Sequence, residues 1–102
     1  MPVLEKRSGY VTIDPRGEHP RDVKVNSRIV DSSNVTSVAW LVDGETELPY
    51  NDPHLMIVRF KGGGTYGYIG VSRQRAVAAA YYASTGKYIN DRIKPYFEAV
   101  RL

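Results

Sequence analysis

A run of three glycines divides the most strand-like part of this chain and limits what can form there. Residues 55–71 read LMIVRFKGGGTYGYIGV, with apolar segments on both sides of Gly62, Gly63 and Gly64. Both segments alternate in the period of two that is typical of β-strands. Glycine adopts positive φ without a steric cost, so the run suits a tight reversal of the chain. The stretch therefore predicts a β-hairpin, and not a phosphate loop, because the glycines precede a strand instead of a helix.

Several segments before this hairpin also have strand or turn composition. Residues 10–13 and 23–30 are predicted as strands that can pair across a loop, which has turn chemistry at 14–17. Residues 31–34 (DSSN) predict a turn, because these side chains bond their own backbone.

The next strand, residues 35–42 (VTSVAWLV), is predicted from its β-branched and aromatic content. Val38, Trp40 and Val42 would form one apolar face, which places Trp40 in the core. Residues 43–53 hold two prolines and four acidic residues, so we expect a solvated acidic connection.

One helix is predicted after the hairpin. Ser72 is a good N-cap, and residues 73–84 are rich in alanine. Gly86 stands where a glycine often follows the last turn of a helix. The buried face is predicted to be Val77, Ala80, Tyr81 and Ser84.

The C-terminal segment is read as mostly non-helical. Residues 88–90 are expected to be extended or turning, and Asn90 to cap a single helical turn at 91–94 that Pro95 ends. Residues 96–102 fit a last strand or a short helix equally well. The fold class predicted is α+β: a small antiparallel meander of three or more strands with one helix packed on it. Residues 30–102 form this domain, and residues 1–29 an extension that can add an N-terminal hairpin.

The charge is unevenly distributed. Residues 1–54 carry six lysines and arginines against nine acidic residues, whereas residues 55–102 carry eight against two. The formal charge is therefore −3 in the first part and +6 in the second. A basic C-terminal half favours a polyanionic partner, although a solvated face balanced by the acidic half explains it as well.

Composition also indicates what the chain lacks. It has no cysteine, which fits a reducing cytoplasm. No apolar run approaches the roughly 20 residues that cross a bilayer, so no membrane association is expected. His19 and His54 are single loop histidines without the spacing of a metal site. We expect no cofactor and no enzymatic activity, because no local arrangement of nucleophile, base and acid is present.

Several motifs in order resemble the KTSC domain, a family named after a C-terminal extension of some lysyl-tRNA synthetases and also found as short bacterial and phage proteins. Its Tyr-x-Tyr mark corresponds to Tyr66-Gly67-Tyr68, and its Ser, Gly, aromatic and Asn stretch to residues 84–90. The resemblance covers residues 30–96. The connection at 43–53 is longer than in such domains, and residues 1–29 have no counterpart. RNA binding is what the resemblance implies.

Tyr66 and Tyr68 lie on one side of a predicted strand, and Gly67 leaves the other side bare. Two exposed rings so placed can stack on successive bases. The alternative is that both rings lie in the core beneath the helix. Likewise, Tyr88 either contacts nucleic acid or anchors its loop to the core. The candidate nucleic-acid-binding residues are Tyr66, Tyr68, Arg59, Lys61, Arg73, Arg75, Lys87, Tyr88, Arg92 and Lys94.

Two functions remain open from the sequence. The first is a small non-catalytic module that binds RNA or single-stranded DNA through these residues. The second is a phage or bacterial accessory protein that binds a host protein or assembles into a homo-oligomer through a sheet edge or residues 1–29.

Overall fold

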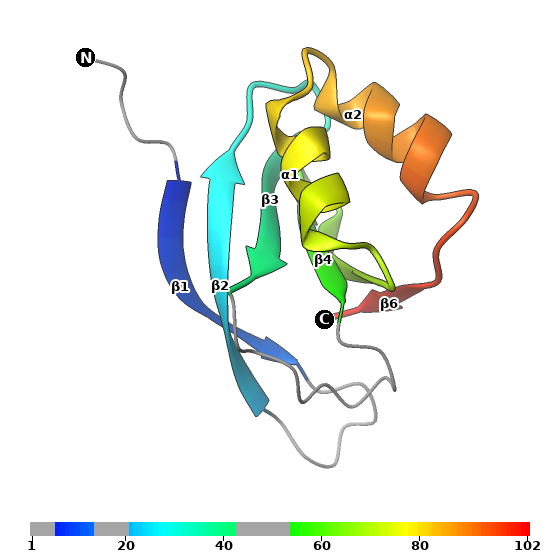
Figure 1. Cartoon of the computed structure of the whole chain (residues 1–102). Coiled ribbons are helices and arrows are strands. Elements are labelled where there is room, and N and C mark those ends of the chain that lie inside the picture. Colours follow the sequence, from blue (N-terminus) through cyan, green and yellow to red (C-terminus); the bar gives the residue numbers. More distant parts are fainter. Residues whose placement is uncertain (1–5, 14–20, 43–53) are drawn as a thin grey trace.

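The fold is a single antiparallel sheet with helices on one face (Figure 1). The computed structural model describes residues 6–13, 21–42 and 54–102. Six strands follow one another in the sheet in chain order, which confirms the predicted α+β meander. The strands are β1 (Lys6–Ile13), β2 (Arg21–Ile29), β3 (Val35–Leu41), β4 (Leu55–Phe60), β5 (Gly64–Ile69) and β6 (Ala99–Arg101).

The glycine run makes the turn predicted for it. β4 and β5 pair from Leu55 opposite Ile69 to Phe60 opposite Gly64. Gly62 has a φ of 70° and Gly64 a φ of 90°, values that residues with a side chain rarely adopt. The tight hairpin therefore depends on glycine at both ends of the reversal.

The N-terminal hairpin is part of the same sheet. β1 pairs with β2 over eight residues, and β2 in turn pairs with β3. The hairpin expected for residues 1–29 is thus present, with a first strand that begins at Lys6 instead of residue 10. Because β2 pairs directly with β3, the sheet is continuous across the predicted boundary between residues 1–29 and residues 30–102. The turn predicted at 14–17 and the acidic connection predicted at 43–53 lie outside the described residues.

The helical layer differs from its prediction in length. α1 spans Arg73–Tyr81, and Ser72 caps it as predicted, its Oγ accepting a hydrogen bond from the Arg75 amide at 3.2 Å. The helix ends at Tyr81, not at residue 84, because the Tyr82 backbone is extended. Two side chains satisfy its last carbonyls: Thr85 Oγ1 donates to Ala79 at 2.9 Å, and Arg28 Nη1 donates to Ala80 at 2.6 Å.

Of the predicted buried face of α1, only Ala80 is confirmed as buried. Ala76, Ala79 and Ala80 are buried, whereas Tyr81 and Ser84 are exposed and Val77 is half-buried. Alanine leaves no bulk between the helix axis and the sheet, so this stripe lets α1 lie close to β3. The large side chains are consequently turned outward.

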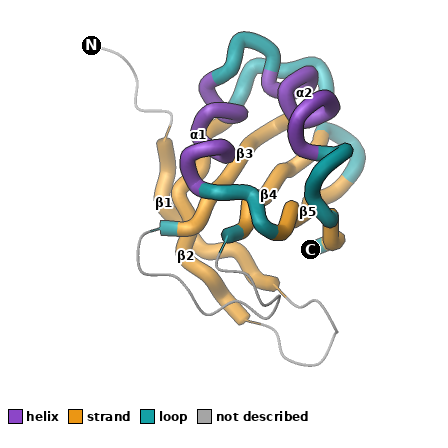
Figure 2. The backbone as a smooth tube through the Cα atoms, turned by 45° about the vertical axis from the view of Figure 1, so that its right-hand side comes forward, coloured by secondary structure: helices purple, strands orange, loops and turns teal. Residues whose placement is uncertain are grey.

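A continuous helical segment follows where extended chain and a single turn were expected. α2 (Thr85–Tyr88) runs into a π-helical turn, η1 (Ile89–Ile93). Gly86 therefore lies inside a helix and not after one, and Asn90 is not a cap. Ile89 and Ile93 are buried four residues apart, which fixes this turn on the core. Figure 2 shows α1 and α2 on the same side of the sheet.

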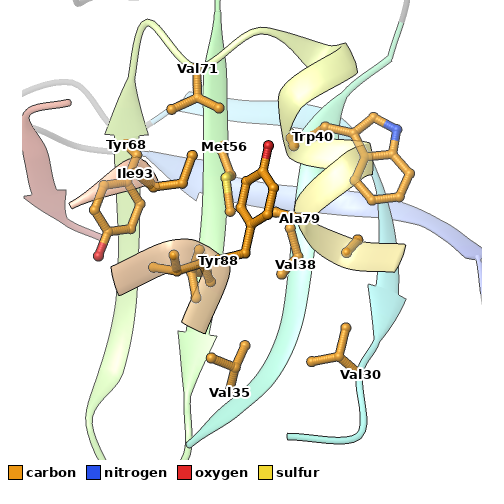
Figure 3. Packing of buried hydrophobic residues seen from close by; sticks show 14 residues of the cluster. Val30, Val35, Val38, Trp40, Met56, Tyr68, Val71, Ala79, Tyr88 and Ile93 are labelled. Atoms are coloured by element: carbon orange, nitrogen blue, oxygen red, sulfur yellow. The ribbon is translucent and has the colours of Figure 1, made fainter. Parts of the chain in front are cut away.

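Two apolar clusters lie on the two faces of the sheet. The helix-side core contains the predicted Val38 and Trp40, together with Met56, Val58, Tyr68, the α1 alanines, Tyr88, Ile89 and Ile93 (Figure 3). The far-side core consists of Val23, Val25, Ala39, Leu41, Leu55 and Ile57. β4 is buried on both faces, which explains its unbroken apolar run. Val42 lies just beyond the end of β3 and is half-buried.

The chain ends in a strand, one of the two alternatives left open for residues 96–102. β6 is short, pairing Ala99, Val100 and Arg101 with Tyr68, Gly67 and Tyr66 of β5. No described helix is long and apolar enough to span a membrane.

Candidate nucleic-acid interface

The two tyrosines of the Tyr-x-Tyr motif have different surroundings. Their register opposite Val58 and Met56 puts both on the helix side of β5. Tyr68 is 3% exposed within the helix-side core, and Tyr66 is half-buried at its margin. The core alternative therefore holds for Tyr68, and its ring cannot stack on a base.

The far side of the motif was expected to be bare, but the structure shows it covered. Gly67 is buried, and a β-carbon at this position would lie 3.1 Å from Leu55 Cδ1 and 3.5 Å from Val100 Cγ2. Glycine is needed here because the far-side core packs directly against the backbone of β5. The motif is thus shaped by packing on both faces of the sheet.

Tyr66 opens onto a hollow of about 470 Å³, here called the aromatic groove. It is lined by Phe60, Gly63, Tyr66, Tyr68, Lys94, Phe97 and Ala99. The rings of Phe60 and Tyr66 meet edge to face, with centroids 5.8 Å apart and planes at 69°. Of the predicted site residues, this groove unites Tyr66, Tyr68 and Lys94.

Cations lie over the rings of this groove. Lys94 Nζ is 5.2 Å from the Phe60 centroid, and the Arg101 guanidinium is 6.0 Å from that of Tyr66. Both distances are within the range of a cation–π contact. Sequence reasoning did not select Phe60, Phe97 or Arg101. Phe60 and Arg101 end their strands and Phe97 stands two residues after Pro95, so no local pattern marks them. The groove forms only when β6 pairs with β5.

A second hollow of about 310 Å³, the basic hollow, adjoins the groove. Ser72, Gln74, Arg75, Ala78, Tyr88 and Arg92 line it. The Arg75 guanidinium lies 6.0 Å from the ring of Phe97, a lining residue of the aromatic groove, so the two hollows meet there.

Tyr88 is an anchor and not a contact surface. It is 7% exposed and belongs to the helix-side core, where Figure 3 shows its ring among the labelled residues. Its edge still reaches the basic hollow, where the Arg92 guanidinium lies 5.2 Å from its centroid. The same guanidinium is 6.0 Å from the ring of Tyr82, which is exposed and packs against Tyr88. Sequence reasoning missed Tyr82.

The cations around these two hollows share one property. No carboxylate of the described residues forms an ion pair with Arg75, Arg92, Lys94 or Arg101. Together with the rings of Phe60, Tyr66 and Phe97, these four side chains are called the basic–aromatic surface.

The remaining predicted cations lie elsewhere. Arg59 alternates with Val58 and Phe60 on β4, so it is on the far face of the sheet. Lys61 Nζ donates to the Ser32 carbonyl at 2.6 Å and secures the β4–β5 turn. Arg73 is the exposed first residue of α1.

Lys87 forms an ion pair with Asp91. Its Nζ lies 2.8 Å from Asp91 Oδ2, four residues later and on the exposed side of α2 and η1. This hydrogen bond, reinforced by the charge of the carboxylate, raises the pKa of Lys87 above its usual value.

A third hollow, of about 590 Å³, was not anticipated and is called the polar hollow. It is lined by the turn residues Asp31, Ser32, Ser33 and Asn34 and by Ala83, Ser84, Gly86, Lys87, Asn90 and Asp91. Ser32 Oγ donates to Asn34 Oδ1 at 3.0 Å and accepts from the Val35 amide at 3.3 Å. A side chain at position 86 would collide with Asn34, so glycine allows α2 to approach the turn.

Among the residues of the two aromatic-lined hollows, one tyrosine has a shifted pKa. Burial, and secondly the neighbouring Tyr66, raise the pKa of Tyr68 above its ordinary value. The described residues contain no group of three histidines, cysteines or acids placed to hold a metal. His54 is exposed, and His19 lies outside the described residues.

Comparisons of the chain with protein-family models, with curated proteins and with solved structures found no match. The KTSC resemblance consequently stays a prediction that rests on the motifs quoted above.

Proposed function

We propose that the protein is a non-catalytic module that binds single-stranded nucleic acid, RNA or DNA, on the basic–aromatic surface. One observation carries the proposal. Arg75, Lys94 and Arg101 each lie over one of the three rings, Arg92 lies over Tyr88, and none of the four cations has a carboxylate partner among the described residues. Cations neutralise phosphates and release their counterions, while ring faces stack on bases. A surface that offers both is suited to a strand whose bases are accessible.

The positions of the cations support this proposal. A guanidinium or ammonium over a ring is held by the ring while its N–H groups stay available to a phosphate. Arg75 and Arg92 line the basic hollow, and Lys94 and Arg101 border the aromatic groove. Acidic side chains are scarce here, because residues 55–102 contain Asp91 and Glu98 alone, and Asp91 is paired with Lys87.

We further propose that residues 30–102 form a KTSC-like domain that works in the cytoplasm. Its motif stretch at 84–90 and the turn at 31–34 line the same polar hollow. This juxtaposition supports the resemblance, since it gives a shared structural reason for Asn34 and Gly86. The absence of cysteine fits the proposed compartment.

The test is salt-dependent binding of a labelled single-stranded oligonucleotide, followed by fluorescence anisotropy. We expect Arg75→Ala and Lys94→Ala each to weaken binding and to reduce the slope of log affinity against log salt by about 1. Arg59→Ala is the matched control, because it removes the same charge from the opposite face of the sheet. Equal losses of affinity in all three variants would mean that only the net charge of the protein matters, and would contradict the proposal.

Protein interaction is the second candidate, and it has its own observation. Ile29 is 45% and Tyr81 56% exposed, and the Arg28 guanidinium lies 4.4 Å from the Tyr81 ring. Exposed aromatic and arginine side chains are enriched at protein interfaces. Retention of a host protein, or of a second copy, by the purified chain after nuclease treatment and its loss in Tyr81→Ser would favour this function.

A further inference from the structure

We propose that the aromatic groove takes one unstacked base of the bound strand while the basic hollow holds an adjoining phosphate. This inference rests on the proposed function and names the feature that is recognised: an unpaired base next to its phosphodiester. A duplex, whose bases are stacked and paired, cannot supply it.

The walls of the groove fit a flat ring. Phe60 and Tyr66 stand edge to face at 69°, so their planes form a corner and not a flat platform. Phe97 and Ala99 form further parts of the lining, and the buried Tyr68 belongs to it as well. The volume of about 470 Å³ is in the range of small-molecule sites, roughly 300–1,000 Å³. One base can enter such a corner, whereas a stack of bases needs an open sheet surface.

The charges select among aromatic-lined ligands. Aromatic pockets also bind quaternary ammonium groups, but there the cation comes from the ligand. In this groove Lys94 and Arg101 already lie over the rings of Phe60 and Tyr66. A second cation would be repelled by both, while a neutral base that carries a phosphate would not. The groove is therefore matched to a nucleotide.

The phosphate has a place beside the base. Phe97 lines the aromatic groove, and its ring is contacted by Arg75, which lines the basic hollow with Arg92. A strand whose base enters the groove thus passes its backbone over two guanidinium groups. Arginine binds phosphate oxygens with two parallel N–H donors. The two arginines would thus fix the nucleic-acid backbone while the aromatic groove holds the base.

The experiment compares strands that differ only in their bases. Affinities of the full chain are measured for an oligothymidylate, for the abasic strand of the same length and for a duplex of that length, with oligouridylate and its abasic form as the RNA arm. We expect removal of the bases to weaken binding roughly 5- to 150-fold, the effect of losing the stacking of one base. The duplex is expected to bind no more tightly than the abasic strand.

Two variants locate the base. Tyr66→Leu keeps an apolar side chain against the core but removes the ring, and Ala99→Leu fills the groove without changing any charge. Both should weaken binding of the base-carrying strand more than binding of the abasic strand, with near-native Trp40 fluorescence as the test of folding.

The results separate this inference from the proposed function. A base-dependent loss in either the DNA or the RNA arm supports the inference and shows which strand enters the groove. Equal binding of abasic and base-carrying strands in both arms, or equal weakening of both by Tyr66→Leu, overturns it while salt-dependent binding remains. Failure of every strand to bind overturns the proposed function as well.

Discussion

The aromatic groove and the polar hollow border the same helical layer, yet their side chains are used differently. In the groove, Lys94 and Arg101 lie over rings and have no described carboxylate partner. In the hollow, Lys87 is bonded to Asp91, and Ser32 bonds to Asn34.

The difference shows that a basic residue next to an aromatic motif is not sufficient to predict a contact. Lys87 lies within α2 and Lys94 directly follows η1, and the two lysines looked alike in sequence. A nearby carboxylate satisfies Lys87, whereas Lys94 faces the groove. We infer that the aromatic groove binds nucleic acid, whereas the residues of the polar hollow hold α2 against the turn at 31–34.

The largest effect on stability is expected from Thr85→Val, which lies between two lining residues of the polar hollow and joins α2 to α1. Thr85 is buried, and its hydroxyl donates to the Ala79 carbonyl at 2.9 Å. The nearly isosteric valine removes this bond, which should lower the free energy of unfolding by about 1 kcal/mol. Urea unfolding followed by Trp40 fluorescence measures the change.

Its control is the neighbouring residue. Ser84→Ala should leave stability within about 0.5 kcal/mol, because Ser84 is exposed and makes no side-chain cap bond. Nucleic-acid affinity is expected to be unchanged in both variants. A loss of affinity in folded Ser84→Ala would give the polar hollow a role in binding, because Ser84 lines it.

A smaller effect is expected from Tyr68 on the free energy of unfolding at high pH. The pKa of Tyr68 is raised in the folded state, chiefly by burial, so the unfolded chain loses this proton first. The stabilising contribution is complete below the unfolded value near 10 and is lost as pH rises through the folded pKa. Stability should therefore fall less steeply above pH 10 in Tyr68→Phe than in the parent protein.

Absorbance titration of the tyrosines provides a direct measurement. Tyr66→Phe should lower the pKa of Tyr68 only in part, because Tyr66 is the lesser of its two causes. If Tyr66→Phe restored the ordinary pKa, the ring of Tyr68 would be solvated and the assignment of that ring to the core would be wrong.

The smallest effect is expected from Asp91→Asn. This change releases Lys87, whose pKa should fall back toward its usual value by NMR titration. Glu98→Gln alters the charge equally but beside Phe97 and Ala99, which line the groove. We expect Glu98→Gln to raise nucleic-acid affinity more than Asp91→Asn does. The reverse order would move the binding surface to the hollow.

Much of the sheet was predictable because its signals are local. The alternation on both sides of the glycine turn predicted the hairpin that β4 and β5 form, and Ser72 marked the start of α1. The end of that helix was not predictable. It depends on Thr85 and Arg28 reaching Ala79 and Ala80, and Arg28 comes from a strand more than fifty positions earlier.

The site shows the same limit. Tyr66 and Lys94 were identified from their residue types, but Phe60, Phe97 and Arg101 were not, since no short spacing relates them. Arg59 was selected for its charge, and its place on the far face follows from the register of β4 with its neighbours.

The sequence by itself determined the meander, the hairpin turn and a basic C-terminal half, because periodicity, glycine conformation and charge act over a few residues. Only the tertiary structure decided which tyrosine is buried and which rings line a groove. Each of those outcomes depends on the pairing of β6 with β5 and on the packing of α1, α2 and η1 against the sheet. Such contacts join residues that are distant in the chain, and no local pattern encodes them.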